Sequence, residues 1–559
     1  MATEIKRVQV SPVNPRGYLV ILTAFIIVGL FYFLPGLEQV PLNPSDEIVV
    51  YYMGEPVDAA ALNEEELYLP FSFIEQYVDS NIRWDEKSQT VIITTAQEVF
   101  HLPLGKREGL LNFRPYTFTY PVLNKENKIF LPARPLDEYY NLELHYLQDE
   151  SVVIIRDLEK PLQEGRTLEN VKLRKEPGPM SPWLAGLEKG TPVFIMREKN
   201  GWYWVETGDG LMGYLDKKMV HLTGIKTAEI SKEVYQPWNP LGERIMLTWE
   251  GAWGSTVNPA GLGELTGVQV VSPTWFSLKE NGVVKNTADY HYVQWAHQTG
   301  RQVWGLFDNS FDAELSHEFL NSAELRAQAI RQLLTYVELY QLDGINLDFE
   351  NMYLKDRELY VQFVRELAPL LHEKDRSISL NVTFLSQSEN WSMCYDRKSL
   401  AEIVDYVTVM AYDENGTFST TAGSVASIPW VEDGIKKILQ EIPGEKIILG
   451  VPFYTRLWEE ATDGQGERTL TSQAISMTKQ NNWIKENNLE IKEDSAAGQH
   501  YVEVQKAGKT FKMWLEDEYS MSRRIELMRK YHLAGIAAWR RGLEQEGFWP
   551  LLAEMLNKY

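Results

Sequence analysis

The stretch QLDGINLDFENM, Gln341 to Met352, decides the fold because it combines a strand pattern with three carboxylic acids. Successive side chains of a strand point to opposite faces, so alternate residues share a face. One face carries Asn346, Asp348 and Glu350, and the other carries Ile345, Leu347 and Phe349. The stretch therefore predicts a strand that packs its apolar face on helices and turns a polar row toward an enclosed interior.

Seven further apolar segments of strand type accompany this one, and amphipathic helical stretches such as Ala323–Gln341 and Lys355–Lys374 separate most of them. The strand candidates are Arg244–Glu250, Gly267–Pro273, Arg301–Phe307, Gly344–Glu350, Ser377–Phe384, Tyr406–Tyr412, Lys446–Phe453 and Gly535–Arg540. Strands that are mostly each followed by a helix predict an α/β protein, with a (β/α)8 barrel over residues 240–559. A longer insert, roughly Thr455 to Asp517, is expected after strand seven.

The polar row falls at the C-terminal end of its strand, where barrel enzymes of this type keep their chemistry. Acids crowded in a poorly solvated site raise each other's pKa, so that one can hold a proton near neutral pH. Glu350 is last in the row and nearest the mouth, and it is the expected proton donor. Two alternatives fit the alternation less well: a calcium site, which draws its oxygens from one loop with a glycine at the bend, and a solvated acidic edge.

Several motifs resemble glycoside hydrolase family 18, the chitinase family. DGINLDFE is similar to the DGxDxDxE signature, and VTVMAYDENG, IILGVPFYTRLW and GIAAWRRG are similar to the strand-six, strand-seven and strand-eight motifs. The segment MWLEDEYSM resembles the segment before the last strand in the bacterial branch of the family that cuts spore cortex peptidoglycan. The resemblance covers roughly Arg244 to Tyr559 and implies a glycosidase.

The chain departs from the signature at Asn346, where the family has a second Asp. An Asn cannot share a charge with Asp348, so we expect Asp348 to be less perturbed and the pH optimum to move. Chitinase-like lectins of the family typically lose the Glu, whereas Glu350 is kept here. The departure is therefore not interpreted as a loss of activity.

The resemblance implies cleavage of the β-1,4 bond after an N-acetylglucosamine, with the substrate's own acetamido group as nucleophile. Glu350 would protonate the leaving oxygen and then act as base on water. Asp348 would orient the acetamido group and stabilise the oxazolinium ion. Tyr412 would donate a hydrogen bond to the acetamido carbonyl.

The remaining expected site residues support this chemistry. Asn346 and Asp343 would stabilise the row by hydrogen bonding. Trp539 would stack on the sugar, and Asp413 and Met410 would contact the substrate. No metal and no organic cofactor is required. Trp249, Trp253, Trp275 and Trp458 also lie at or beyond strand ends, and some of them are expected to line the sugar groove.

Two small modules are expected ahead of the barrel. Tyr68–Ile93 and Phe130–Ile155 form a weak repeat, each unit reading as strand, short helix, strand, turn, strand. Residues 47–157 resemble the N-terminal repeat domain of copper amine oxidases, without copper ligands. Residues 168–224 have short strands with Gly and Asn-Gly turns and resemble a bacterial SH3-like barrel, which would hold cell wall or act as a spacer. Within it, alternation places Tyr203 opposite Trp202 and Trp204.

The N-terminus predicts an export signal. Gly17 to Leu34 is free of charge, and as a helix it would span about 27 Å, enough for a bilayer core. Lys6, Arg7 and Arg16 precede it, which predicts a cytoplasmic tail over residues 1–16 and an extracellular catalytic domain. A cleaved signal peptide is the alternative, although no small-residue cleavage site follows the apolar segment.

Composition argues against some classes of binding partner and structural feature. The formal net charge of -23 argues against nucleic-acid binding, which requires a basic face. The lone Cys394 excludes an internal disulfide and is expected in the core. The sequence thus favours a membrane-anchored hydrolase of peptidoglycan, with a chitinase and a non-catalytic glycan-binding surface protein as alternatives.

Overall fold

The computed structural model describes residues 20, 22–24, 36, 38–45, 47–59, 61–226, 235–240, 244–252, 265–462 and 468–557. The expected cytoplasmic tail and most of the expected membrane helix, all but Val20 and Leu22–Ala24, therefore lie outside the described residues. Across the described part of the chain, none of the helices combines the length and apolar character needed to cross a bilayer.

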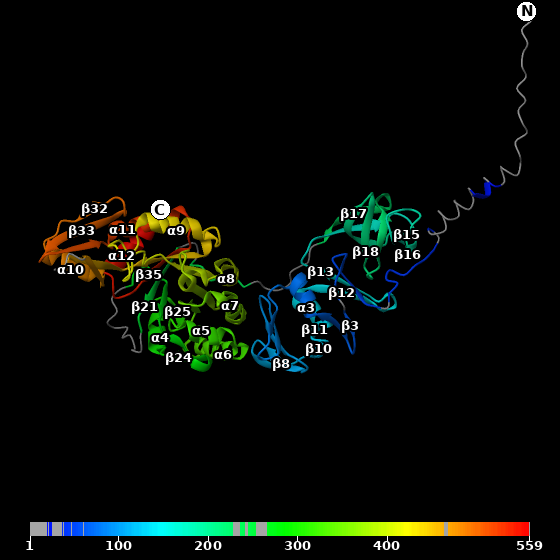
Figure 1. The fold of residues 1–559 in the computed structure, drawn as a ribbon, viewed down its shortest axis with the longest axis horizontal. Helices are drawn as coiled ribbons and strands as arrows, with labels where there is room; N and C mark the ends of the chain where they lie inside the picture. The colour runs from blue at the N-terminus through cyan, green and yellow to red at the C-terminus, as the bar shows by residue number, and fades with distance from the viewer. Residues whose placement is uncertain are drawn as a thin grey trace, which may run out of the picture. The chain divides into compact units, whose positions relative to one another are not determined.

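The C-terminal unit contains the barrel (Figure 1). Its eight strands pair in parallel, and the β22–β25 pairing completes the closed ring. They are β21 (Ile245–Glu250), β22 (Val270–Pro273), β25 (Gln302–Asp308), β26 (Gly344–Asp348), β27 (Ser377–Thr383), β28 (Tyr406–Met410), β29 (Ile447–Pro452) and β35 (Gly535–Trp539). Seven lie within a segment expected to be a strand, and β25 runs one residue beyond its expected end, to Asp308, so the prediction of a (β/α)8 barrel is confirmed.

Alternation along each strand separates two apolar layers. On β25, Trp304 and Leu306 belong to a cluster inside the ring, together with Tyr406 and Ile448 from the opposite side. Val303 and Phe307 of the same strand belong to the larger cluster between strands and helices. The inner layer therefore fills the lower lumen, and polar side chains begin above it.

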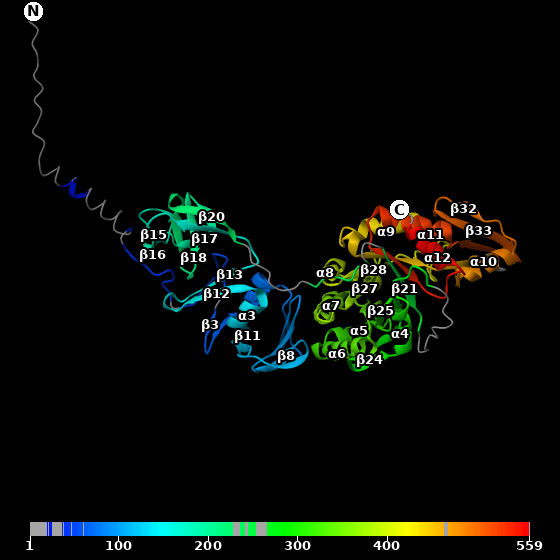
Figure 2. The same cartoon turned by 180° about the vertical axis from the view of Figure 1, so that it is seen from behind.

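The helices lie outside the strands (Figure 2). They are α4 (Tyr290–Gln298), α5 (Ala313–Leu320), α6 (Ala323–Tyr340), α7 (Arg357–His372), α8 (Arg397–Ile403), α9 (Ile428–Ile438), α11 (Glu518–Lys530) and α12 (Phe548–Asn557). Short polar residues cap several of them: the side chains of Asp289, Asp312 and Ser322 accept backbone N–H groups at the starts of α4, α5 and α6.

The insert after strand seven is a small α+β layer. Its antiparallel sheet has the order β31-β30-β34-β33-β32, from β30 (Tyr454–Thr462), β31 (Arg468–Ser476), β32 (Lys492–Asp494), β33 (Gln499–Lys506) and β34 (Lys509–Trp514). Helix α10 (Met477–Glu486) contributes Ile484 to an apolar cluster with Val502 and Met513 of this sheet.

The N-terminal unit contains the repeat and SH3-like modules. Strands β4 (Leu67–Pro70) and β11 (Lys128–Pro132) carry the matching Leu-Pro pairs of the two repeats and pair antiparallel, with Leu69 opposite Leu131. Each is followed by helical turns and two further strands, as the repeat predicts. Part of the first repeat instead belongs to the C-terminal unit: residues 83–101 and 109–116 cluster there, and Ile92, Val99 and Phe113 join the outer apolar layer of the barrel.

The SH3-like module is a seven-stranded sheet of order β16-β15-β19-β18-β17-β14-β20. Besides β18, its strands are β14 (Leu162–Thr167), β15 (Val171–Arg174), β16 (Trp183–Leu187), β17 (Pro192–Lys199), β19 (Met212–Asp216) and β20 (Val220–Lys226). Strand β18 (Trp202–Thr207) follows the expected alternation, since Tyr203 packs in the module's own core while Trp202 and Trp204 pack on the other face. Trp204 is buried against Val152 and Ile154 of the repeat module, and its Nε1 donates to the Gly54 carbonyl at 2.8 Å.

Candidate active site

The polar row of β26 rises from the filled part of the lumen. Asn346 is fully buried, Asp348 is 6% exposed, and Glu350 just beyond the strand is half-buried. Their neighbours Ile345, Leu347 and Phe349 pack in the outer apolar layer. The alternation in the sequence therefore places the three polar side chains on the lumen side of the strand.

Asn346 is held by five hydrogen bonds. Its amide nitrogen donates to Ser379 Oγ at 2.9 Å and Asn381 Oδ1 at 3.0 Å. Its amide oxygen accepts from Trp249 Nε1 at 3.2 Å, Ser272 Oγ at 3.4 Å and Asn381 Nδ2 at 3.1 Å. Because an amide both donates and accepts, it also satisfies the Ser379 and Asn381 oxygens, which a carboxylate would leave without a donor.

Asp348 is joined to this network by Asn381, whose Nδ2 donates to Asp348 Oδ1 at 2.9 Å. Burial raises the pKa of the Asp348 carboxyl to about 6; the hydrogen bond from Asn381 opposes the rise, and the negative charge of Asp308 adds to it. The pKa of Asp348 is therefore raised even though Asn346 carries no charge. That the rise is smaller than with an Asp at position 346 stays a prediction.

Glu350 is positioned through its backbone. The side chain of the fully buried Asn309 accepts from the Glu350 N–H at 3.1 Å and donates to the Glu350 carbonyl at 2.6 Å, while Ser316 Oγ accepts from Asn309 at 2.8 Å. Burial, followed by the negative charges of Asp348, Asp413 and Asp308, holds the pKa of Glu350 well above its usual range. A carboxyl in this setting keeps its proton near neutral pH and can donate it.

Tyr412 and Asp413 follow strand β28 at the same mouth. Burial, then the neighbouring Tyr454, Asp348 and Glu350, hold the pKa of Tyr412 well above its usual range, so its hydroxyl remains a donor. Asp413 has a left-handed backbone, with φ of 62°, and its carboxylate accepts from Tyr454 Oη at 2.6 Å. Met410, two residues before Tyr412, is 8% exposed at the end of the strand.

Trp539 ends strand β35 and packs edge-on against Trp249, with ring centroids 5.5 Å apart. Trp249 is itself buried and holds Asn346, so Trp539 is the more accessible ring of the pair. Trp275 and Trp458 are also buried, and Trp458 Nε1 donates to the Gly423 carbonyl at 2.8 Å. These rings are therefore structural, and Trp253 lies outside the described residues.

Asp343 does not belong to the site, contrary to the sequence-based expectation. Its carboxylate accepts from the Val303 N–H at 2.8 Å and lies 2.8 Å from His297 Nε2. It precedes β26, at the end of the barrel opposite to Glu350. An odd separation from Asn346 also excludes it from the face that carries the row.

The structure adds residues that the sequence did not single out. Asn381 and Asn309 hydrogen-bond directly to the polar row, and Asp308 ends strand β25 at the level of Asp348. Three exposed aromatic side chains lie in the segments that follow barrel strands, namely Phe311, Trp391 and Phe418. Phe311 lies three residues beyond the end of β25, whereas Trp391 and Phe418 each lie eight residues beyond the ends of β27 and β28, so no local pattern marks these two in the sequence.

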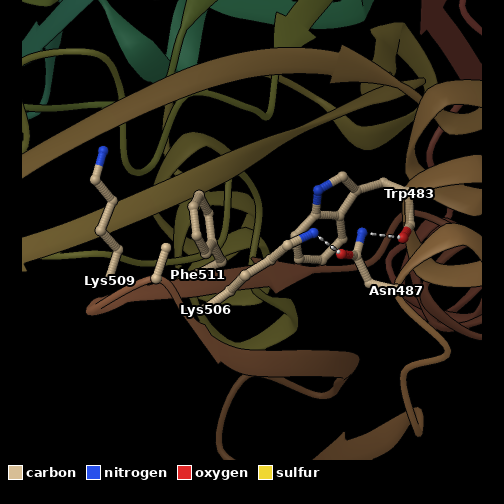
Figure 3. A pocket seen from close by; sticks show the side chains of 6 residues that line it. Trp483, Asn487, Lys506, Lys509 and Phe511 are labelled. Atoms are coloured by element: carbon tan, nitrogen blue, oxygen red, sulfur yellow. Dashed lines mark hydrogen bonds between the residues drawn. The ribbon is translucent and has the colours of Figure 1, made fainter.

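A pocket of about 300 Å3 lies on the insert (Figure 3). Trp483 and Phe511 form its apolar side, and Lys506 Nζ donates to Asn487 Oδ1 at 2.8 Å across it. It shares no residue with the polar row. Within the described ranges, no group of three or more His, Cys, Asp or Glu residues could hold a metal ion.

Comparison with known proteins divides the chain in the same way. Residues 309–544 match the family model described as glycosyl hydrolases family 18. Residues 52–155 match the copper amine oxidase N-terminal domain, and residues 168–221 match the bacterial SH3 domain.

Two curated relatives come from Bacillus subtilis (strain 168). The chain is 25% identical over 297 residues to the uncharacterized glycosylase YvbX, an alignment that covers 51% of this chain and 84% of that protein. It is 29% identical over 262 residues to the cortical fragment-lytic enzyme, covering 46% of this chain and 59% of that protein. The alignment thus spans less than two thirds of the second relative.

Solved structures share the fold. A chitinase from Chromobacterium violaceum ATCC 12472 has a TM-score of 0.50 at 21% identity, covering 56% of this chain and all (100%) of that one. The spore cortex-lytic enzyme SleL of Bacillus megaterium QM B1551 has a TM-score of 0.50 at 19% identity, covering 68% and 90%. The resemblance drawn from the motifs is confirmed: the barrel is a glycosyl hydrolases family 18 domain, and it makes the chain a glycosidase.

Proposed function

We propose that this glycosidase cuts the β-1,4 bond after N-acetylglucosamine in peptidoglycan of the cell wall or spore cortex, by substrate-assisted, retaining catalysis. The observation that carries the proposal is the pair Asp348 and Glu350, two acids of raised pKa at the barrel mouth, beside the protonated hydroxyl of Tyr412. Proton donor, ion stabiliser and hydrogen-bond donor are the three groups this reaction needs.

In the first step Glu350 gives its proton to the glycosidic oxygen as the bond to the anomeric carbon breaks. The acetamido oxygen of the substrate attacks that carbon and forms an oxazolinium ion. Asp348 stabilises the positive charge, and Tyr412 donates a hydrogen bond to the acetamido oxygen. Since Asn381 fixes one Asp348 oxygen at 2.9 Å, the other is left to meet the acetamido N–H.

In the second step water attacks the anomeric carbon and gives its proton to the Glu350 carboxylate. The acetamido group leaves, and two displacements at one carbon retain its configuration. The backbone clamp from Asn309 keeps Glu350 in place for both proton transfers. Trp539 offers a stacking face to the sugar, and Met410 and Asp413 border the same mouth.

Peptidoglycan is favoured over chitin as the substrate by a module outside the barrel and by one relative. A bacterial SH3 domain lies ahead of the barrel, and one relative is a cortical fragment-lytic enzyme. We propose that the SH3 domain holds the wall, and that Gly17–Leu34 anchors the protein in the membrane with the barrel outside the cell. A chitinase and a non-catalytic glycan-binding protein remain the alternatives.

The test is to incubate the protein with purified peptidoglycan, with chitin and with de-acetylated peptidoglycan, and to identify soluble products by mass spectrometry. Release of fragments from acetylated peptidoglycan is expected. Cleavage of chitin alone would favour the chitinase, and binding of both polymers without release would favour the glycan-binding protein.

A further inference from the structure

Strand β25 carries a second polar position at the level of the catalytic row. Its inward-facing residues are Trp304, Leu306 and then Asp308, because Trp304 and Leu306 belong to the apolar cluster inside the ring. In the parallel register between β25 and β26, Leu306 pairs with Asn346, and Asp308 pairs with Asp348. Asp308 therefore stands beside Asp348 on the lumen side.

Burial raises the pKa of the Asp308 carboxyl above its usual value, and two hydrogen bonds and two cations oppose the rise. Its carboxylate accepts from Ser277 Oγ at 3.0 Å and from the Ser310 N–H at 2.8 Å. The cations that act on it are Lys279 at the end of β23 (Phe276–Lys279) and Lys285 on β24 (Val283–Asn286). The acids that face it are Asp348 and Glu350, and the negative charge of Asp308 raises the pKa of both.

The neutral Asn346 leaves the row one negative charge short of the family signature. All five of its hydrogen bonds go to uncharged partners, so nothing below Asp348 on β26 supplies that charge. We propose that Asp308 is a positioning residue that supplies, from the neighbouring strand, the negative charge absent at Asn346, and so keeps on Glu350 the proton that it donates. This inference rests on the proposed function.

The experiment compares the pH dependence of kcat on peptidoglycan for the wild type and four variants of the full chain. In Asp308→Asn, which keeps the shape, the alkaline limb should move to lower pH by about one unit, because Glu350 loses its proton earlier. Asp308→Glu should leave the alkaline limb at its wild-type pH. Adding Asn346→Asp to Asp308→Asn should return the limb toward that pH. Asp433→Asn removes an exposed charge on α9 and should leave it unmoved.

An unmoved limb in Asp308→Asn, or an equal shift in Asp433→Asn, would overturn the inference while leaving the proposed function intact. If the wild type cleaves none of the glycans, the proposed function fails instead. The inference is then tested by thermal unfolding at pH 5 and pH 8. From pH 5 to pH 8, the Asp308→Asn variant should lose less stability than the wild type does. Adding Asn346→Asp to that variant should bring the loss back to the wild-type size. Equal losses in all variants would refute it.

Discussion

Replacing Glu350 with Gln should separate catalysis from folding. Gln has the size of the acid but no proton to deliver, and general acid–base catalysis contributes roughly 10²–10⁴-fold. At about 1.4 kcal/mol for each factor of ten, the barrier should rise by about 3–5 kcal/mol. Within the described residues no hydrogen bond to the Glu350 carboxylate is found, whereas both backbone bonds to Asn309 remain possible in the variant.

The same substitution should change how stability depends on pH. Burial and three neighbouring acids raise the pKa of Glu350 in the folded protein, so the folded state binds this proton more tightly than the unfolded state. Its contribution is fully present below the unfolded pKa, and it is lost as the pH rises through the folded value. Glu350→Gln removes this loss, so at pH 8 the variant should be at least as stable as the wild type.

The assay measures kcat on peptidoglycan together with thermal unfolding at pH 5 and pH 8. Glycan binding should persist in the variant. Near-wild-type turnover in a folded Glu350→Gln protein would remove Glu350 from the role of acid. A variant that is less stable than the wild type at pH 8 would show that the carboxylate has a stabilising partner, and the electrostatic reasoning would be wrong.

Three further predictions follow from the site and the N-terminus. Tyr412→Phe keeps the ring but not the hydroxyl, so kcat should fall while the melting temperature changes little; equal kcat values would exclude the hydrogen bond to the acetamido group. De-acetylation of the sugar before the cut removes the nucleophile and should abolish cleavage, and a thiazoline mimic of the oxazolinium ion should inhibit; undiminished cutting would contradict substrate assistance. Protease added outside intact cells should reach the barrel but not residues 1–16, and a protected barrel would reverse the orientation inferred from Lys6, Arg7 and Arg16.

Much of the barrel could be predicted because its strands are marked by patterns between residues close in sequence. Period-two alternation places Asn346, Asp348 and Glu350 on one face, and each strand segment is long and apolar enough to be recognised alone. The same alternation could have excluded Asp343, which lies an odd number of residues from the row and accepts from Val303 at the other end of the strand.

The rest depends on register between strands that are distant in sequence. Asn381 reaches Asp348 across the β26–β27 pair, and Asp308 is placed beside Asp348 by the β25–β26 pair. No local pattern marks either contact. The burial of the tryptophans could not be predicted for the same reason. Trp204 is buried by contacts with the repeat module, and Trp249 is buried by the hydrogen-bonded network in the lumen.

The chemical identity of the new reducing end tests the central claim most directly. Peptidoglycan is digested with the protein, and the fragments are reduced with borodeuteride and analysed by mass spectrometry. An acetamido group on the sugar before the cut acts as nucleophile, and Glu350, Asp348 and Tyr412 are placed to assist it at N-acetylglucosamine. The account predicts labelled N-acetylglucosaminitol at the new ends; labelled N-acetylmuramitol would contradict it.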